Sequence, residues 1–105
     1  MAIYGTARFS VKPEAVDRCR PVIEEFVSYV RESEPGTKLY LSLQDRADPT
    51  RFLHVMIFDD EAAEDLHANS DAVKRFTEVL YAETVDGVTF EKYTAVGPGL
   101  SLELA

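Results

Sequence analysis

The sequence predicts a single α+β domain built on a four-stranded antiparallel sheet, and three observations lead to this prediction. The first is size and composition: 105 residues with 46% hydrophobic and 29% charged side chains are typical of one globular core. The second is the order of hydrophobic patterns, which runs strand, helix, strand, strand, helix, strand. The third is a set of turn and capping residues that separates these patterns.

The first third of the chain predicts a strand and a helix. Alternation of side-chain type predicts a strand over Ile3–Val11. Pro21 interrupts the helical pattern that follows and removes a backbone N–H, so we expect a kink, or a short turn before the main helix, near Arg20. Pro35 and Gly36 end the helix. Apolar residues at helical spacing are Val16, Cys19, Ile23, Phe26 and Val30.

The remaining elements are a hairpin, a broken helix and a last strand. Two alternating runs, Leu39–Gln44 and Phe52–Phe58, predict strands joined by a polar loop. Capping residues at Asp59 or Asp60, and again at 69–71, predict a second helical region in two pieces. Asp86 and Gly87 then predict a turn into a fourth strand over 88–96.

This order is that of a ferredoxin-like βαββαβ domain, whose right-handed crossovers place both helical regions on one side of the sheet. The side covered by helices is expected to carry Leu39, Leu41, Leu53, Val55 and Phe90. The uncovered side is then expected to display Tyr4, Tyr40, Phe52, His54, Met56, Phe58 and Tyr93. An aromatic surface of this size predicts a homodimer, with an interface formed by Tyr4, Phe52, His54, Met56 and Tyr93.

The domain is expected to span 1–96, and 97–105 form a C-terminal tail. Leu100, Leu102 and Leu104 alternate with polar residues in this tail. Two interpretations remain open: a disordered end, or a short strand that docks on the partner subunit.

Charge and cysteine content exclude several classes of function. Eleven Lys and Arg against 19 Asp and Glu give a net charge of -8, which repels nucleic acid and anionic membranes. No apolar run is long enough to span a bilayer, and the single Cys19 fits a reducing, cytoplasmic setting and a core position. Without a short-spaced ligand pair or a Gly-rich phosphate loop, neither a metal nor another cofactor is expected.

Small side chains on the first strand predict a cavity. Gly5 and Ala7 leave space on its helix-facing side, which suits a flat apolar ligand. The alternative is that the first helix simply approaches closely there. The other residues expected around the cavity are Phe26, Phe58, His67, Phe76 and Leu80.

Two stretches resemble the antibiotic biosynthesis monooxygenase family. One is Glu34-Pro35-Gly36-Thr37-Lys38-Leu39-Tyr40, and the other is the aromatic, acidic and Glu-Ala run of 58–63 followed by Leu66-His67-Ala68-Asn69-Ser70. The resemblance implies a dimeric α+β barrel, in which two sheets stack face to face and each subunit holds a pocket. It also implies cofactor-independent oxidation of a small aromatic, quinol or polyketide-like substrate.

The resemblance also assigns roles by position. The haem-degrading branch carries Asn and Trp at the positions where this chain has Ala7 and Phe58, and this difference disfavours haem as a substrate. Met56 stands where many members carry Glu. His67 is the remaining candidate base, with Tyr40 or Tyr93 as a hydrogen-bond partner, and the alternative is a surface or capping histidine. Two other functions stay open: a non-catalytic binding or structural module, and an isomerase-like enzyme acting on a hydroxy-keto compound.

Overall fold

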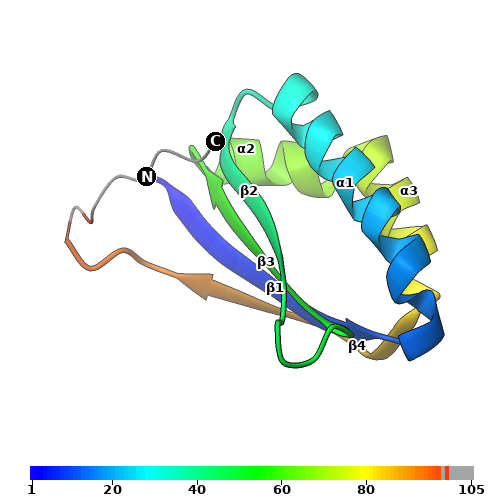
Figure 1. Cartoon of the computed structure of the whole chain (residues 1–105). Coiled ribbons are helices and arrows are strands. Elements are labelled where there is room, and N and C mark those ends of the chain that lie inside the picture. Colours follow the sequence, from blue (N-terminus) through cyan, green and yellow to red (C-terminus); the bar gives the residue numbers. More distant parts are fainter. Residues whose placement is uncertain (98, 100–105) are drawn as a thin grey trace.

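A computed structural model describes residues 1–97 and 99, and it places all the helices on one side of a four-stranded antiparallel sheet (Figure 1). The strand order is β2-β3-β1-β4. This arrangement confirms the ferredoxin-like α+β fold predicted from the order of the patterns. The strands are β1 (Ile3–Val11), β2 (Thr37–Gln44), β3 (Arg51–Phe58) and β4 (Thr84–Tyr93).

The helices are η1 (Pro13–Ala15), α1 (Val16–Ser33), α2 (Glu61–Ala68) and α3 (Asp71–Tyr81). The predicted break in the second helical region is confirmed, because the side chains of Asp60 and Ser70 cap α2 and α3 separately. The expected turn near Arg20 is wrong: α1 continues through Pro21, and the short turn lies earlier, at η1. Pro21 is exposed, so water can bind the backbone carbonyl that it leaves without a partner.

The strand register corrects the faces predicted for β3. Directly paired residues share a face, and the pairs Ala7↔His54 and Phe9↔Phe52 place the β3 side chains beside the helix-facing residues of β1. Met56 is likewise paired with Gly5. Phe52, His54, Met56 and Phe58 are therefore buried under the helices, together with the half-buried Tyr40, and not displayed on the uncovered side.

The other side of the sheet, which we call the open face, is formed by the alternate residues. Four residues predicted under the helices lie on the open face instead: Leu39, Leu41, Leu53 and Val55. Tyr4 and Tyr93 lie on the open face as predicted. Phe90 lies on the covered side as predicted, opposite Ala7. The physical reason is that both sets on β2 and β3 are apolar, so alternation alone does not decide between them. The large β3 side chains lie beside the small residues of β1 on the covered side. The apolar residues of the open face are Tyr4, Leu39, Leu41, Leu43, Leu53, Val55, Ile57 and Tyr93.

The edge strand β4 begins earlier than predicted. Asp86 and Gly87 have φ angles of 63° and 75° and form an irregularity inside the strand, because Phe9 pairs with Val88 whereas Ser10 pairs with Val85. These two residues therefore form an irregularity within β4 and not the turn before it, because Thr84 and Val85 are already paired with β1. Residues 98 and 100–105, which include the three leucines of the tail, lie outside the described residues, so the short strand or disordered end predicted there stays a prediction.

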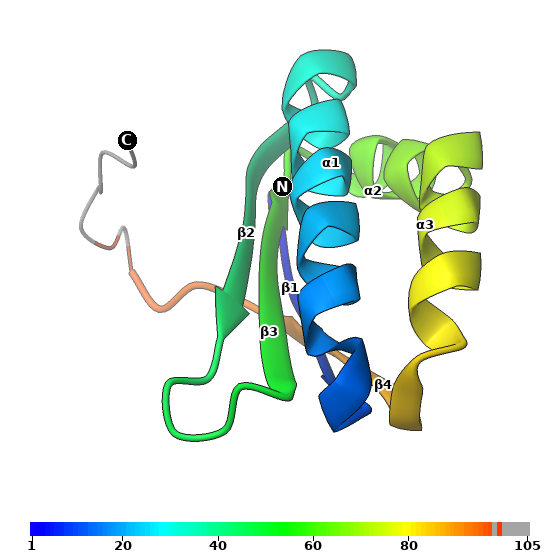
Figure 2. The same ribbon diagram turned by 45° about the vertical axis from the view of Figure 1, so that its right-hand side comes forward.

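The main core lies between α1, α3 and the sheet. Figure 2 shows α1 and α3 side by side, and the rings of Phe26 and Phe76 stack between them with centroids 4.1 Å apart. Cys19 is buried in this core, and burial raises the pKa of its thiol. In the part of the chain that the structure describes, no helix is long and apolar enough to cross a membrane.

Candidate active site

A cavity of about 340 Å³ lies between the covered side of the sheet and helices α2 and α3. Its walls are mainly apolar, and it opens along β4, where Phe90 is 65% exposed. The sequence assigned six residues to a pocket, and all six line this cavity: Gly5, Ala7, Phe26, Phe58, Phe76 and Leu80. His67 lines it as well.

The floor of the cavity follows from residue size on β1. Gly5 and Ala7 contribute almost no side-chain volume, while their partners Met56 and His54 on β3 are large. A Cβ atom added to Gly5 would lie 3.5 Å from the backbone oxygen of Glu91, an ordinary van der Waals distance, so there is room here for a side chain that glycine does not supply. The helices therefore rest on the β3 side chains and leave a hollow above β1.

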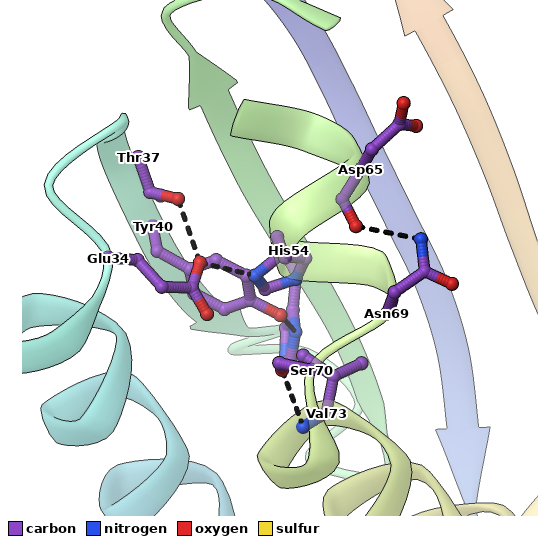
Figure 3. A network of polar contacts seen from close by, with 9 residues as sticks. Glu34, Thr37, Tyr40, His54, Asp65, Asn69, Ser70 and Val73 are labelled. Carbon is purple, nitrogen blue, oxygen red and sulfur yellow. Dashed lines mark hydrogen bonds and ion pairs between the residues drawn. The ribbon is translucent and has the colours of Figure 1, made fainter. Parts of the chain in front are cut away.

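A buried histidine and a buried carboxylate meet at one wall of this cavity. Nδ1 of His67 lies 2.7 Å from Oε1 of Glu34, and the two side chains are only 10% and 4% exposed. The Thr37 hydroxyl donates a second hydrogen bond to the same oxygen, at 2.9 Å (Figure 3). His67 is thus a pocket residue held by a carboxylate and not a surface or capping histidine.

The turn after α1 brings Glu34 to His67. Glu34 is the C-cap residue that directly follows α1, and the backbone carbonyl of Gly36 accepts a hydrogen bond from the backbone N–H of Asp59, at 2.8 Å. Asp59 directly precedes the residue that caps α2, so this bond fixes the start of α2 against the turn. Gly36 also lies so close to Ala63 of α2 that an added Cβ atom would come within 2.7 Å of the Ala63 Cβ.

Substituting Gly36→Ala is expected to weaken the Glu34–His67 pair. The new methyl group pushes α2 away from the turn, and overpacking of this kind costs about 1 to 3 kcal/mol. Urea unfolding should show the loss of stability, and NMR of the His67 ring should show the altered pair. The double variant Gly36→Ala/Ala63→Gly relieves the clash and should recover most of the native pair signal; a single variant with unchanged stability would contradict the close packing.

A second buried histidine lies across the cavity wall. His54 is 2% exposed, and its Nδ1 lies 2.9 Å from the Tyr40 hydroxyl. Burial lowers the pKa of His54 to about 4 and raises the pKa of Tyr40, so the imidazole is neutral and the phenol keeps its proton at neutral pH. The Tyr40 ring also packs between the two histidines, with centroids 5.5 Å from each.

Burial of His54 predicts a loss of stability in acid. Its folded pKa of about 4 lies below the ordinary 6.5, so below pH 6.5 the unfolded chain binds a proton that the folded chain does not. Stability therefore falls as the pH falls from 6.5 toward 4, by about 3 kcal/mol from this group. Urea unfolding of the native protein and of His54→Gln across this range measures it, and an equal acid loss in both would contradict the assignment.

Charged residues surround the opening of the cavity. Lys92 of β4 forms an ion pair of 3.1 Å with Glu64 of α2, and this pair bridges the two elements across the opening. Both side chains line the cavity, as does Lys74 of α3. These charged side chains and the two histidine networks are among the polar groups of a lining that is mainly apolar.

The described residues contain no group of three or more His, Cys, Asp or Glu side chains placed to hold a metal ion. The chemistry that this site offers from its own side chains is proton transfer and hydrogen bonding in an apolar cavity.

Comparison with known proteins identifies the family. The model of the antibiotic biosynthesis monooxygenase family matches residues 2–79. The chain belongs to this family. A crystal structure of an antibiotic biosynthesis monooxygenase is 29% identical, with 91% of this chain and 99% of that chain covered and a TM-score of 0.85. No curated protein matches the sequence.

Other solved structures share the fold of this monooxygenase-family chain. A conserved protein from Methanosarcina mazei Go1 is 24% identical, with 89% of this chain and 91% of that chain covered and a TM-score of 0.82. A protein from Pseudomonas aeruginosa is 22% identical, with coverages of 91% and 95% and a TM-score of 0.82.

The structure separates the predicted interface residues of this family member into two groups. Phe52, His54 and Met56 are buried within the subunit and cannot form an intersubunit surface. Tyr4 and Tyr93 lie on the open face, paired with each other across β1 and β4. Tyr40 is the hydrogen-bond partner of a histidine, as expected of one of the two tyrosines, but that histidine is His54 and not His67.

Sequence reasoning missed Glu34 as a functional residue. Glu34 reads as the polar end of a helix before a Pro-Gly turn, and most glutamates at such positions are solvated. The available signal was its place at the head of the Glu-Pro-Gly run that carried the resemblance. The missed pairing of Tyr40 with His54 follows from the incorrect faces of β2 and β3.

Proposed function

We propose that the protein is a cofactor-independent monooxygenase that oxidises an activated phenol or quinol in this cavity, with His67 as the proton acceptor. The observation that carries the proposal is the His67–Glu34 pair in the wall of an apolar cavity. Membership of the antibiotic biosynthesis monooxygenase family supports the reaction class. The apolar lining favours a flat aromatic substrate.

Glu34 prepares His67 for this role. An ionised Glu34 accepts the hydrogen bond from Nδ1–H, which leaves the lone pair on Nε2 as the proton acceptor. Within the part of the chain that the structure describes, no protein group forms a hydrogen bond to Nε2 of His67. A carboxylate that orients an imidazole in this way also stabilises the imidazolium formed after proton transfer.

The proposed reaction balances without a further reductant. His67 takes the phenolic proton, and the electron-rich ring anion reduces oxygen. One oxygen atom forms a new C–O bond on the ring, and the other leaves as water with the ring hydrogen and the proton held by His67. A phenol and one O2 thus give a quinone and one water, while the cavity orients the ring and excludes solvent.

The test is oxygen uptake by metal-stripped protein with a panel of naphthols and quinols. We expect uptake coupled to quinone formation, and a large loss in His67→Gln but not in Glu61→Gln, an exposed residue of the same helix. Binding of the panel compounds without oxygen uptake would replace this proposal with a non-catalytic binding module. Conversion of a hydroxy-ketone without oxygen uptake would favour an isomerase-like function.

We also propose that two subunits associate through their open faces. Members of this family are generally dimeric. Eight apolar side chains cover the open face, from Tyr4 and Tyr93 at one side to the leucines of β2 at the other. Burying such a surface against a second copy would remove it from water, and each cavity would lie on the opposite side of its own sheet.

A further inference from the structure

The hydrogen bond between Tyr40 and His54 fixes the position of one proton on the imidazole. The Tyr40 hydroxyl keeps its proton, and His54 is neutral, so the hydroxyl donates and Nδ1 accepts. A neutral imidazole that accepts at Nδ1 carries its hydrogen on Nε2. His54 therefore presents an N–H donor at Nε2.

This donor has no acceptor among the residues that the structure describes. Nε2 of His54 is buried, and no group within the described residues forms a hydrogen bond with it. A buried donor left without a partner costs about 1 to 3 kcal/mol, which is why most such groups in folded proteins have one. An oxygen or nitrogen atom of a ligand placed at this position would supply the partner.

Ring geometry directs the donor toward the cavity floor. The two nitrogens of an imidazole point in nearly opposite directions, and Nδ1 points to Tyr40 on β2. Nε2 consequently faces away from β2, on the side where Ala7 of β1 lies next to His54. Both residues line the cavity, and an edge-to-face contact with Phe9, with centroids 5.1 Å apart, holds the ring in this orientation.

We propose that His54 recognises the substrate by donating its Nε2–H to a ring-conjugated carbonyl oxygen. The substrate class is then an aromatic hydroxy-ketone, with its hydroxyl at His67 and its carbonyl at His54. This inference rests on the proposed function, because it uses the same cavity. The bond strengthens as His67 removes the proton, since the negative charge spreads onto the carbonyl oxygen.

Binding of a matched pair of ligands tests this assignment without turnover. The probes are 1-tetralone, which carries a ring-conjugated carbonyl, and tetralin, which lacks it. Calorimetry should show the ketone binding about 10-fold or more tightly to the native protein, because a hydrogen-bonding site discriminates against an analogue without the acceptor. His54→Phe should abolish this preference. Phe76→Leu, which changes only an apolar wall, should weaken both ligands alike.

An NMR measurement on the native protein covers the case in which His54→Phe does not fold. Addition of 1-tetralone should move the His54 Nε2–H resonance downfield, and tetralin should not. Equal affinities for the two probes, or an Nε2–H resonance that does not shift when the ketone is added, would overturn the inference. Absence of oxygen uptake with the ketone preference intact would reject the oxygenase proposal alone.

Discussion

Replacing His67 by Gln is expected to lower the turnover of an oxidised phenol by about 10² to 10⁴, the usual contribution of a positioned acid or base. Gln keeps a side-chain N–H donor for the buried Glu34 carboxylate but cannot accept the substrate proton. The fall should therefore appear in kcat, with little change in KM or in the melting temperature. Steady-state oxygen uptake with purified protein measures it.

The choice of Gln follows from the burial of Glu34. His67→Ala would leave a carboxylate that is only 4% exposed without its partner, and removal of one member of a buried pair costs about 3 to 5 kcal/mol. An inactive Ala variant would then report unfolding as readily as lost catalysis. Full activity of a folded His67→Gln protein would show that another group accepts the proton.

Glu34→Gln separates orientation from proton acceptance. The amide keeps the length of the side chain but removes the charge that stabilises the imidazolium, so we expect a smaller fall in kcat, about 10- to 100-fold. The pH dependence of kcat should shift as well, which a purely structural role of Glu34 would not produce. Glu61→Gln, which makes the same chemical change on the exposed surface of α2, serves as the matched control.

The sequence predicted the elements well because their signals are local. The alternation over Ile3–Val11 gave β1 with both of its ends, and the two side-chain caps at Asp60 and Ser70 divided α2 from α3 as predicted. Each of these features depends on residues a few positions apart. Their order along the chain then leaves few topologies, of which the ferredoxin-like one was observed.

The faces of β2 and β3 could not be predicted in the same way. Leu53 and Val55 on one side of β3 are as apolar as Phe52 and Met56 on the other, so hydrophobicity does not choose between them. The choice depends on the register with β1, where small residues accept large neighbours, and that register is a property of the assembled sheet. The error also concealed the hydrogen bond between Tyr40 and His54.

The sequence predicted the residues that line the cavity but not the hydrogen bonds between its polar residues. Small residues on β1 and aromatic residues on the helices are visible in the sequence, and they line one cavity in the structure. The Glu34–His67 pair joins residues 33 positions apart and depends on the contact between Gly36 and Ala63. No spacing rule connects these positions, because their proximity arises only when the turn after α1 packs on α2.

A charge introduced on the open face is expected to dissociate the proposed homodimer without unfolding the subunit. Val55 lies at the centre of this face, on the inner strand β3, and is half-buried in the single chain. In Val55→Lys the ammonium group would be buried without a partner in the dimer but solvated in the monomer, and the difference is several kcal/mol. Light scattering at micromolar concentration should change from the dimer mass to the monomer mass.

Met56→Lys is the matched substitution on the other side of the same strand. Met56 is 8% exposed and packs against Ala7 and Phe58, so its replacement should unfold the subunit itself, because the charge has no solvated position in the monomer. Circular dichroism therefore separates the two variants: Val55→Lys should keep the native spectrum and Met56→Lys should lose it. A native protein that is monomeric at micromolar concentration, or a Val55→Lys variant that keeps the dimer mass, would rule out association through the open face.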